Sequence, residues 1–299
     1  MKTSLECMAC FLNQSLRVTR LQNCSESQQR EVVLAVAELL PALNLKQTPP
    51  ENAIPIYAKI SEITGCADPY KEIKRIENTK ALAHLSALKS ELEHSASPLL
   101  SAIGFAIAGN IIDYGAADRF DIEATFEKSR DIAFAIDHRE QLLSAITALK
   151  PGASILYLAD NCGEIVYDSL VVEILAKTGC KVTVAVRGLP IINDALIEDA
   201  IDAGLDKYAR IISNGIACPG TPVSECTDEL QTLFNESDLV ISKGQGNFET
   251  LSEVDREVFF LLTVKCKVVG NHLTKMSDNE CSLSGNGEMV VYHSRQKNT

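Results

Sequence analysis

The segment Ala153–Leu175, ASILYLADNCGEIVYDSLVVEIL, decides the fold class. A short apolar run, Ile155–Leu158, stops at the polar cluster Asp160–Glu164, and apolar residues then return at helical spacing. This order predicts a strand that ends in a polar loop and is followed by a helix. Because ligands bind beyond the carboxyl ends of strands in open α/β sheets, the cluster marks a candidate ligand or metal site.

The same alternation of apolar runs and amphipathic segments continues to the C-terminal side. We expect strands at Lys181–Val186, Arg210–Ser213 and Leu239–Ser242, further β-rich runs at Val258–Val264 and Lys265–Val269, and helices at Ile165–Lys177, Asp194–Ala203 and Ser224–Phe234. Successive strands start about 28 residues apart, a spacing typical of βαβ units. The pattern therefore predicts a mostly parallel, Rossmann-like sheet in a three-layer α/β/α arrangement.

The first half of the chain has helical periodicity instead. Helix starts are indicated by Ser25 with Gln28, by Pro69 and by Pro98, while Thr48–Pro50 and Gly65–Asp68 have the composition of turns and Gly115 is expected to end the helix that begins near Pro98. We predict an N-terminal all-helical domain over residues 1–100. An α/β domain over 101–299 follows, in which helices within 101–149 lead into the sheet.

Charge and hydropathy narrow the possible partners. With 28 Lys+Arg against 40 Asp+Glu, the net charge of −12 opposes binding to nucleic acid and to anionic lipid. The longest apolar stretch, Pro98–Ile112, is shorter than the roughly 20 residues that a membrane-spanning helix needs. No secretory leader pattern precedes Cys7, so we expect a cytoplasmic protein without membrane association. The sequence does not indicate an oligomeric state.

Three strand ends carry polar residues that parallel pairing would bring to one edge of the sheet. They are Asp160–Asn161, the segment from Arg187 to Asn193–Asp194, and Lys243–Glu249. Asp160, Asn161 and Asp194 offer hard oxygen ligands of the kind that Mg²⁺ or Mn²⁺ prefers, although Co²⁺ and Ni²⁺ bind most sites more tightly. The glycines around Gln245 leave backbone NH groups open to an anion beside Lys243.

Each of these elements also has a purely structural interpretation. Asp160–Gly163 has the composition of a turn that caps the next helix, and Asp194 alone is typical of a helix N-cap. Glycine loops such as the one after Lys243 are often structural. Only the combination of the three strand ends favours a metal and phosphate site.

Several short segments, in this order, match a known family. They are Cys7–Cys10, Asp68–Lys71 through Lys74 and Asn78, Gly109–Asp113, Asp160–Glu164, Arg187–Gly188 through Asn193–Asp194, and Lys243–Glu249. With them the chain resembles the damage-control phosphatases, metal-dependent enzymes formerly catalogued as domain of unknown function 89, in the archaeal and bacterial subgroup with an N-terminal Cys-x-x-Cys. The resemblance implies N-terminal helices on an α/β/α sheet and a divalent metal on Asp160, Asn161 and Asp194.

The resemblance also implies the contacts of the substrate. It assigns the phosphate to Lys243 and the adjacent Gly244, Gln245, Gly246 and Asn247, with Glu164 and Arg187 as further contacts and with Asn110 and Asp113 facing the same pocket. The last two lie three residues apart, on one helix face, which fits a shared ligand and fits a polar helix end equally well.

The expected activity is hydrolysis of phosphate monoesters of small metabolites, such as sugar phosphates or phosphorylated cofactor precursors. Asp160, Asn161 and Lys243 are the expected catalytic residues, and the attacking group is either a water molecule or the carboxylate of Asp160. A metal-dependent sugar-phosphate or nucleotide transferase or isomerase, or a non-catalytic sensor of a phosphorylated metabolite, remains an alternative.

The cysteines and histidines add little to this chemistry. Cys7 and Cys10 share a helix face but form only half of a usual zinc site, so packing is favoured over a structural metal. The five histidines show no ligand spacing.

Overall fold

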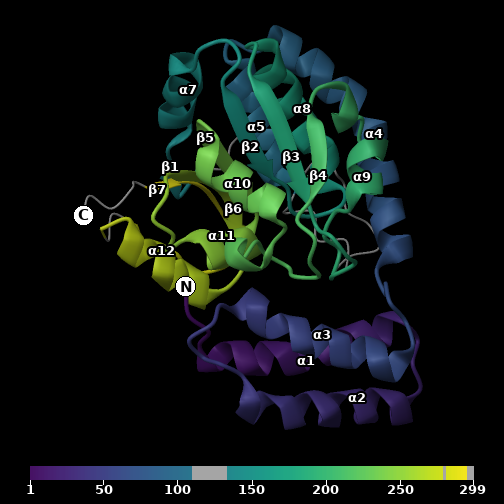
Figure 1. The fold of residues 1–299 in the computed structure, drawn as a ribbon. Helices are drawn as coiled ribbons and strands as arrows, with labels where there is room; N and C mark the ends of the chain where they lie inside the picture. Colours follow the sequence, from purple (N-terminus) through teal and green to yellow (C-terminus); the bar gives the residue numbers. More distant parts are fainter. Residues whose placement is uncertain (110–132, 279–280, 295–299) are drawn as a thin grey trace.

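A computed structural model describes residues 1–109, 133–278 and 281–294, and within them one seven-stranded sheet forms the centre of the fold (Figure 1). The strand order is β1-β7-β6-β5-β2-β3-β4, and neighbouring strands are parallel except for the antiparallel pair of β6 and β7. The strands are β1 Ile136–Asp137, β2 Ser154–Leu158, β3 Lys181–Val186, β4 Arg210–Ser213, β5 Leu239–Lys243, β6 Val258–Val264 and β7 Glu288–Ser294. The predicted mostly parallel α/β sheet is confirmed.

Helices cover both faces of this sheet, and three more lie beneath it. The helices of the described residues are α1 Leu5–Leu21, α2 Glu26–Leu39, α3 Pro49–Thr64, α4 Lys71–His94, α5 Pro98–Ala108, α7 Arg139–Ala148, α8 Glu164–Lys177, α9 Ile197–Asp202, α10 Asp228–Glu236, α11 Gln245–Leu251 and α12 Lys267–Met276. Successive residues of β2 enter opposite cores: Tyr157 packs in the cluster that includes α5 and α8, whereas Leu158 packs in the cluster that includes α10 and α12. Both faces of the sheet are therefore buried, as parallel sheets require.

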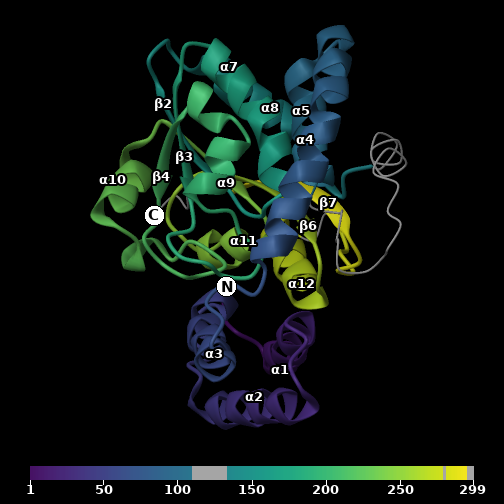
Figure 2. The ribbon, with the colours of Figure 1, turned by 90° about the vertical axis from the view of Figure 1, so that its right-hand side faces the viewer.

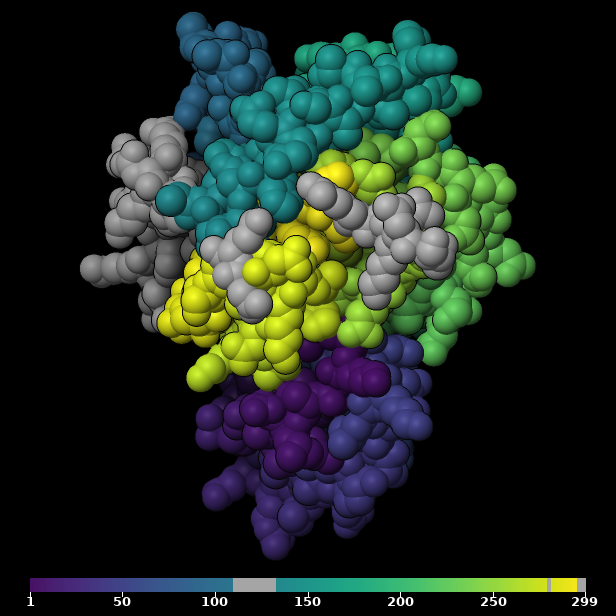
Figure 3. Space-filling view, turned by 90° about the vertical axis from the view of Figure 1, so that its left-hand side faces the viewer, coloured from purple at the N-terminus to yellow at the C-terminus, as the bar shows by residue number. Residues whose placement is uncertain are grey.

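Helices α1, α2 and α3 form a separate block beneath the sheet, which Figures 1 and 2 show from two sides. A cluster of its own, which we call the helical-block cluster, consists of the buried residues Phe11, Val18, Val32, Val36, Ala53, Ile56, Ile60 and Tyr70. In the space-filling view the block, in purple, lies against the yellow C-terminal part of the chain (Figure 3). Helix α4 contacts this cluster near its start, through Ile73, and packs against α8. The change in packing thus falls near the start of α4, while the predicted domain boundary at residue 100 stays a prediction.

Several predicted elements differ from the structure. Residues 265–269 were expected to be β-rich, but β6 ends at Val264 and α12 begins at Lys267, because Val269 and Leu273 pack as one buried helix face. The helix expected from Asp194 begins only at Ile197. The helix expected from Ser224 begins at Asp228, where the Thr227 side chain caps it. Strands β1 and β7 and helix α11 were not predicted.

The long apolar stretch that begins at Pro98 was expected to form a helix. Pro98 begins α5, as predicted, and the helix is buried along most of its length. Its expected end at Gly115 lies outside the described residues. Among the helices that the structure describes, none is both long and apolar enough to cross a membrane.

The segment Thr48–Pro50 begins a helix, although its composition indicated a turn. The Thr48 side chain accepts a hydrogen bond from the Glu51 backbone NH, and the Glu51 carboxylate accepts one from the Thr48 backbone NH at 2.7 Å. This reciprocal capping box, with Pro49 at the first helical position, fixes the start of α3. The capping box predicted at Ser25 and Gln28 is present at the start of α2.

Replacing Thr48 tests this start of α3. We expect Thr48→Ala to lower the free energy of unfolding by about 1 kcal/mol, because an orphaned backbone NH loses its acceptor. Urea unfolding followed by circular dichroism measures the change. Thr48→Ser is the matched control and should restore most of the stability, whereas an unchanged Thr48→Ala midpoint would contradict the assignment.

Candidate metal and substrate site

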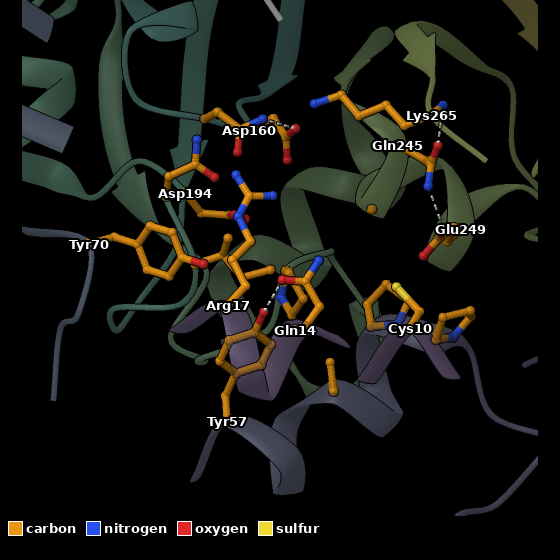
Figure 4. Close-up of a pocket in the computed structure, with 18 of the residues that line it drawn as sticks. Cys10, Gln14, Arg17, Tyr57, Tyr70, Asp160, Asp194, Gln245, Glu249 and Lys265 are labelled. Carbon is orange, nitrogen blue, oxygen red and sulfur yellow. Dashed lines mark hydrogen bonds between the residues drawn. The ribbon is translucent and has the colours of Figure 1, made fainter. Parts of the chain in front are cut away.

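A cavity of about 800 Å³ lies between the helical block and the carboxyl ends of the strands. Figure 4 shows that Gln14, Arg17 and Tyr57 face it from α1 and α3, opposite Asp160 and Asp194 from the sheet. Its volume is in the range of small-molecule sites, which often lie between two structural units. The edge of the sheet that the sequence indicated therefore forms one wall of the cavity, and helices α1 and α3 form the other.

The loops after β2 and β3 are joined by backbone hydrogen bonds. Asn161 and Asp194 form an isolated antiparallel bridge, and the Ala195 NH donates to the Asp160 carbonyl at 2.8 Å. Neither acidic residue caps a helix, because Gly163 is the N-cap of α8 and Leu196 that of α9. Asp194 is thus not a helix cap, whereas the Asp160–Gly163 segment does end in the N-cap of α8. The predicted ligands Asp160, Asn161 and Asp194 are brought together at the cavity wall.

Arg187, at the end of β3, connects the two carboxylates. Its Nε donates to Asp194 Oδ2 at 2.6 Å, and its Nη2 donates to Asp160 Oδ1 at 3.1 Å. The remaining Nη1 donates to the Asn247 side-chain oxygen at 2.9 Å and to the Thr221 hydroxyl at 3.1 Å. The side chain is only 2% exposed, so its contacts are internal. Arg187 and Asn247, both predicted substrate contacts, thus lie behind the carboxylates, outside the cavity lining.

The two buried carboxylates are destabilised as anions. Burial raises the pKa of Asp160 well above its usual value, with Asp194 and Glu164 adding to the shift and Arg187 opposing it. Burial likewise raises the pKa of Asp194, against the effect of Arg187. One guanidinium therefore does not fully compensate the two negative charges, and a second cation would favour their ionised form.

The glycine loop after β5 supports the acidic pair by close packing. A Cβ on Gly244 would lie 1.9 Å from Asp160 Oδ2, and Gly244 has a φ of 77°, so a side chain is excluded on both counts. A Cβ on Gly246 would lie 1.8 Å from the Pro219 carbonyl oxygen. Both glycines thus have a packing reason, and their predicted contact with a phosphate stays a prediction.

Lys243 is buried completely and does not line the cavity. Its ammonium group is hydrogen-bonded to Glu164, to Asp168 at 2.6 Å and to the Ala106 carbonyl at 3.0 Å. These contacts fasten β5 to α8 and α5. Burial raises the pKa of Asp168 to about 6. The predicted phosphate contacts of Lys243 and Glu164 are not tested by this arrangement, in which the two residues bind each other.

Lys265 is a lysine in the cavity wall that the sequence analysis missed. It directly follows β6, is exposed, and its side chain extends toward Asp160 in Figure 4. Its backbone NH donates to the Gln245 side-chain oxygen at 2.8 Å, and Gln245 in turn donates to Glu249 at 3.0 Å. A lysine immediately after the apolar run Val258–Val264 was the available signal.

Helix α4 holds the other side of the Asp160 loop. The Asn78 side chain accepts a hydrogen bond from the Gly163 NH at 2.6 Å and donates one to Asp199 at 2.8 Å. Lys74 forms a buried ion pair with Asp68 at 2.7 Å. These are residues on which the family resemblance rests. Asn110 and Asp113, the other predicted pocket residues, lie outside the described residues.

The cysteines do not form a metal site in the described part of the chain. Cys7, Cys10 and Cys266 line the cavity as free thiols. No group of three or more His, Cys, Asp or Glu side chains in that part is arranged to hold a metal ion. Burial raises the pKa of the Cys162 thiol, so this neighbour of the pair is not an activated nucleophile.

Together these features define a Rossmann-like α/β protein with a cavity between the acidic edge of its sheet and a helical block. The model of the damage-control phosphatase ARMT1-like domain matches residues 3–280, and the chain belongs to this family. The predicted family is thereby confirmed.

Relatives and a solved structure agree with this assignment. A damage-control phosphatase of Pyrococcus horikoshii is 34% identical over 284 residues, which cover 91% of this chain and 94% of the relative. A damage-control phosphatase of Archaeoglobus fulgidus is 33% identical over 281 residues, 91% of this chain and 96% of the relative. The crystal structure of a P. horikoshii protein of the former DUF89 family has a TM-score of 0.87 and 30% identity, covering 99% of this chain and all of that one.

Replacing Arg187 tests how much its guanidinium contributes to the stability of the protein. We expect Arg187→Met to cost about 3–5 kcal/mol of stability at pH 7.5, because two buried carboxylates lose their cation. The cost should shrink as the pH falls, since the pKa values of Asp160 and Asp194 are raised and protonation removes the uncompensated charge.

Urea unfolding of metal-free protein between pH 5 and 8 measures both effects. The matched control is the same substitution in an Asp160→Asn, Asp194→Asn background, where the loss should be much smaller. An equal loss in both backgrounds, or one independent of pH, would show that Arg187 acts through packing alone.

Proposed function

We propose that this protein is a divalent-metal-dependent phosphatase that hydrolyses phosphate monoesters of small metabolites. Family membership and the names of its relatives support phosphatase activity. The observation that carries the proposal is the convergence of Asp160, Asn161 and Asp194 on one cavity wall. The proposed substrates are sugar phosphates or phosphorylated cofactor precursors, whose size suits a cavity of about 800 Å³.

The acidic pair and Asn161 fit a divalent cation. They provide two carboxylates and a carboxamide, hard oxygen donors suited to Mg²⁺ or Mn²⁺ and also able to bind Co²⁺ or Ni²⁺. Asp194 Oδ2 and Asp160 Oδ1 accept hydrogen bonds from Arg187, and Asp160 Oδ2 accepts one from the Asn161 side-chain nitrogen at 2.8 Å, so the Asn161 carboxamide lies directly beside the acidic pair. When bound, such a cation neutralises phosphoryl oxygens and increases the acidity of water.

The protein's own residues would orient the substrate around this centre. Lys265, which extends toward Asp160, is suited to contact an oxygen of the transferred phosphoryl group and to stabilise its charge. Arg187 holds the two carboxylates in a fixed relation through hydrogen bonds of 2.6 and 3.1 Å. Lys243 acts from behind, by fixing Glu164 next to Asn161. The block of α1 and α3 shields the opposite side from water and meets the leaving group.

Phosphate release tests the proposal. Metal-stripped protein is assayed with a panel of sugar phosphates and p-nitrophenyl phosphate, with Mg²⁺, Mn²⁺, Co²⁺ or Ni²⁺ added back. We expect metal-dependent release that falls by about 10²-fold or more in Asp160→Asn, a nearly isosteric change that removes one charged ligand. Lys265→Gln should raise KM or lower kcat while the metal dependence persists.

Controls separate the alternatives. Asp160→Asn should keep the circular dichroism spectrum of the wild type, so that lost activity reflects lost chemistry. Substrate consumption without free phosphate would instead indicate a transferase or isomerase. Binding of a phosphorylated ligand, seen as a raised melting temperature, without any turnover would indicate a sensor.

A further inference from the structure

Ile192 has a backbone conformation that is unusual for its residue type. Its φ is 46°, in the left-handed region. The other non-glycine residues with positive φ among those described are Asn23 and Asp278, which are the residue types that tolerate this region. A β-branched isoleucine pays a steric cost there, and such strain persists only where the surroundings impose it. Ile192 lies in the loop between β3 and α9 that carries Asp194.

The side chain of Ile192 contacts the core of the helical block. The Ile192 side chain packs against the helical-block cluster, whose members come mainly from α1, α2 and α3. Its own loop emerges from the sheet, where the Arg187 NH donates to the Ala195 carbonyl at 3.0 Å. Ile192 is therefore an apolar contact that the sheet makes with the core of the block, and it also lines the cavity.

The position of Ile192 is transmitted directly to the acidic pair. The Asp194 NH donates to the Ile191 carbonyl at 3.1 Å, so a tight turn encloses Ile192. The next residue, Asn193, accepts a hydrogen bond from the Cys162 NH at 2.9 Å, which ties the turn to the loop of Asp160 and Asn161. A shift of Ile192 would move both halves of the site.

We infer that Ile192 is a positioning residue through which the helical block sets the geometry of Asp194 and Asn161. The block packs against the Ile192 side chain, and this contact fixes the turn. The turn then orients the oxygen donors of Asp194 and Asn161. The inference rests on the proposed metal-dependent function. Its consequence is that metal affinity depends on a side chain that touches neither metal nor substrate, because such supporting residues orient the ligands.

The test compares three variants of the full chain. Ile192→Ala removes the contact with the block, and Ile192→Val keeps a shorter β-branched side chain. Leu39→Ala, in α2, is the matched control, since Leu39 packs at the edge of the same cluster but far along the chain from the acidic loops. Metal-free protein is titrated with Mn²⁺ by calorimetry, and amide hydrogen exchange is measured for Cys162 and Ala195.

We expect Ile192→Ala to weaken Mn²⁺ binding by about tenfold or more and to speed exchange at both amides, as loss of a supporting residue does. Ile192→Val should restore both values to near those of the wild type. Leu39→Ala should lower the melting temperature and leave Mn²⁺ affinity and both exchange rates unchanged.

The outcomes separate this inference from the proposed function. A folded Ile192→Ala protein with wild-type affinity and exchange would overturn the inference, and so would equal effects of Leu39→Ala. If the wild type binds no Mn²⁺, the proposed function fails. The exchange rates then still decide whether Ile192 positions the loops.

Discussion

A buried guanidinium shared between two buried carboxylates is the constraint around which this protein is built. Arg187 leaves the end of β3 and binds Asp160 beyond β2 and Asp194 in the following loop. Neighbouring features serve this arrangement: Gly244 lacks the side chain that would collide with Asp160, and Asn247 accepts from the third guanidinium nitrogen. The charges are unequal, because two carboxylates face one cation. That imbalance is the physical reason to propose a divalent metal beside the pair.

The site belongs to two structural units. The sheet supplies the acidic pair and Lys265, while α1 and α3 supply the opposite wall of the cavity. Contacts from outside the sheet also fix the acidic loops, since Asn78 of α4 binds the Gly163 NH and Ile192 packs into the helical-block cluster. In the proposed phosphatase, the sheet would perform the chemistry common to the family, and the helical wall would meet the variable part of the substrate.

The sequence predicted those elements whose burial shows in the local pattern of apolar residues. Strands β2, β3 and β5 are short apolar runs with a polar residue at the end, so both their positions and their common edge could be predicted. Strand β7 was missed because β6 and β7 pair antiparallel, against the expected βαβ repeat. Lys243 was expected to face a ligand, and no sequence signal indicated that Glu164 and Asp168 would enclose it. Lys265 was missed because the sequence analysis placed it in a β-rich run, and Ile192 because its packing arises from tertiary contacts.

The most direct test of the central claim is the anomalous scattering of Mn²⁺ in crystals of the wild-type protein. The account predicts one strong peak within coordination distance, about 2.0–2.6 Å, of oxygens from Asp160, Asn161 and Asp194. A peak at the thiols of Cys7, Cys10 and Cys266 with none at the acidic pair would contradict it. The absence of any Mn²⁺ peak would also contradict it, because Arg187 would then be the cation that compensates the two carboxylates.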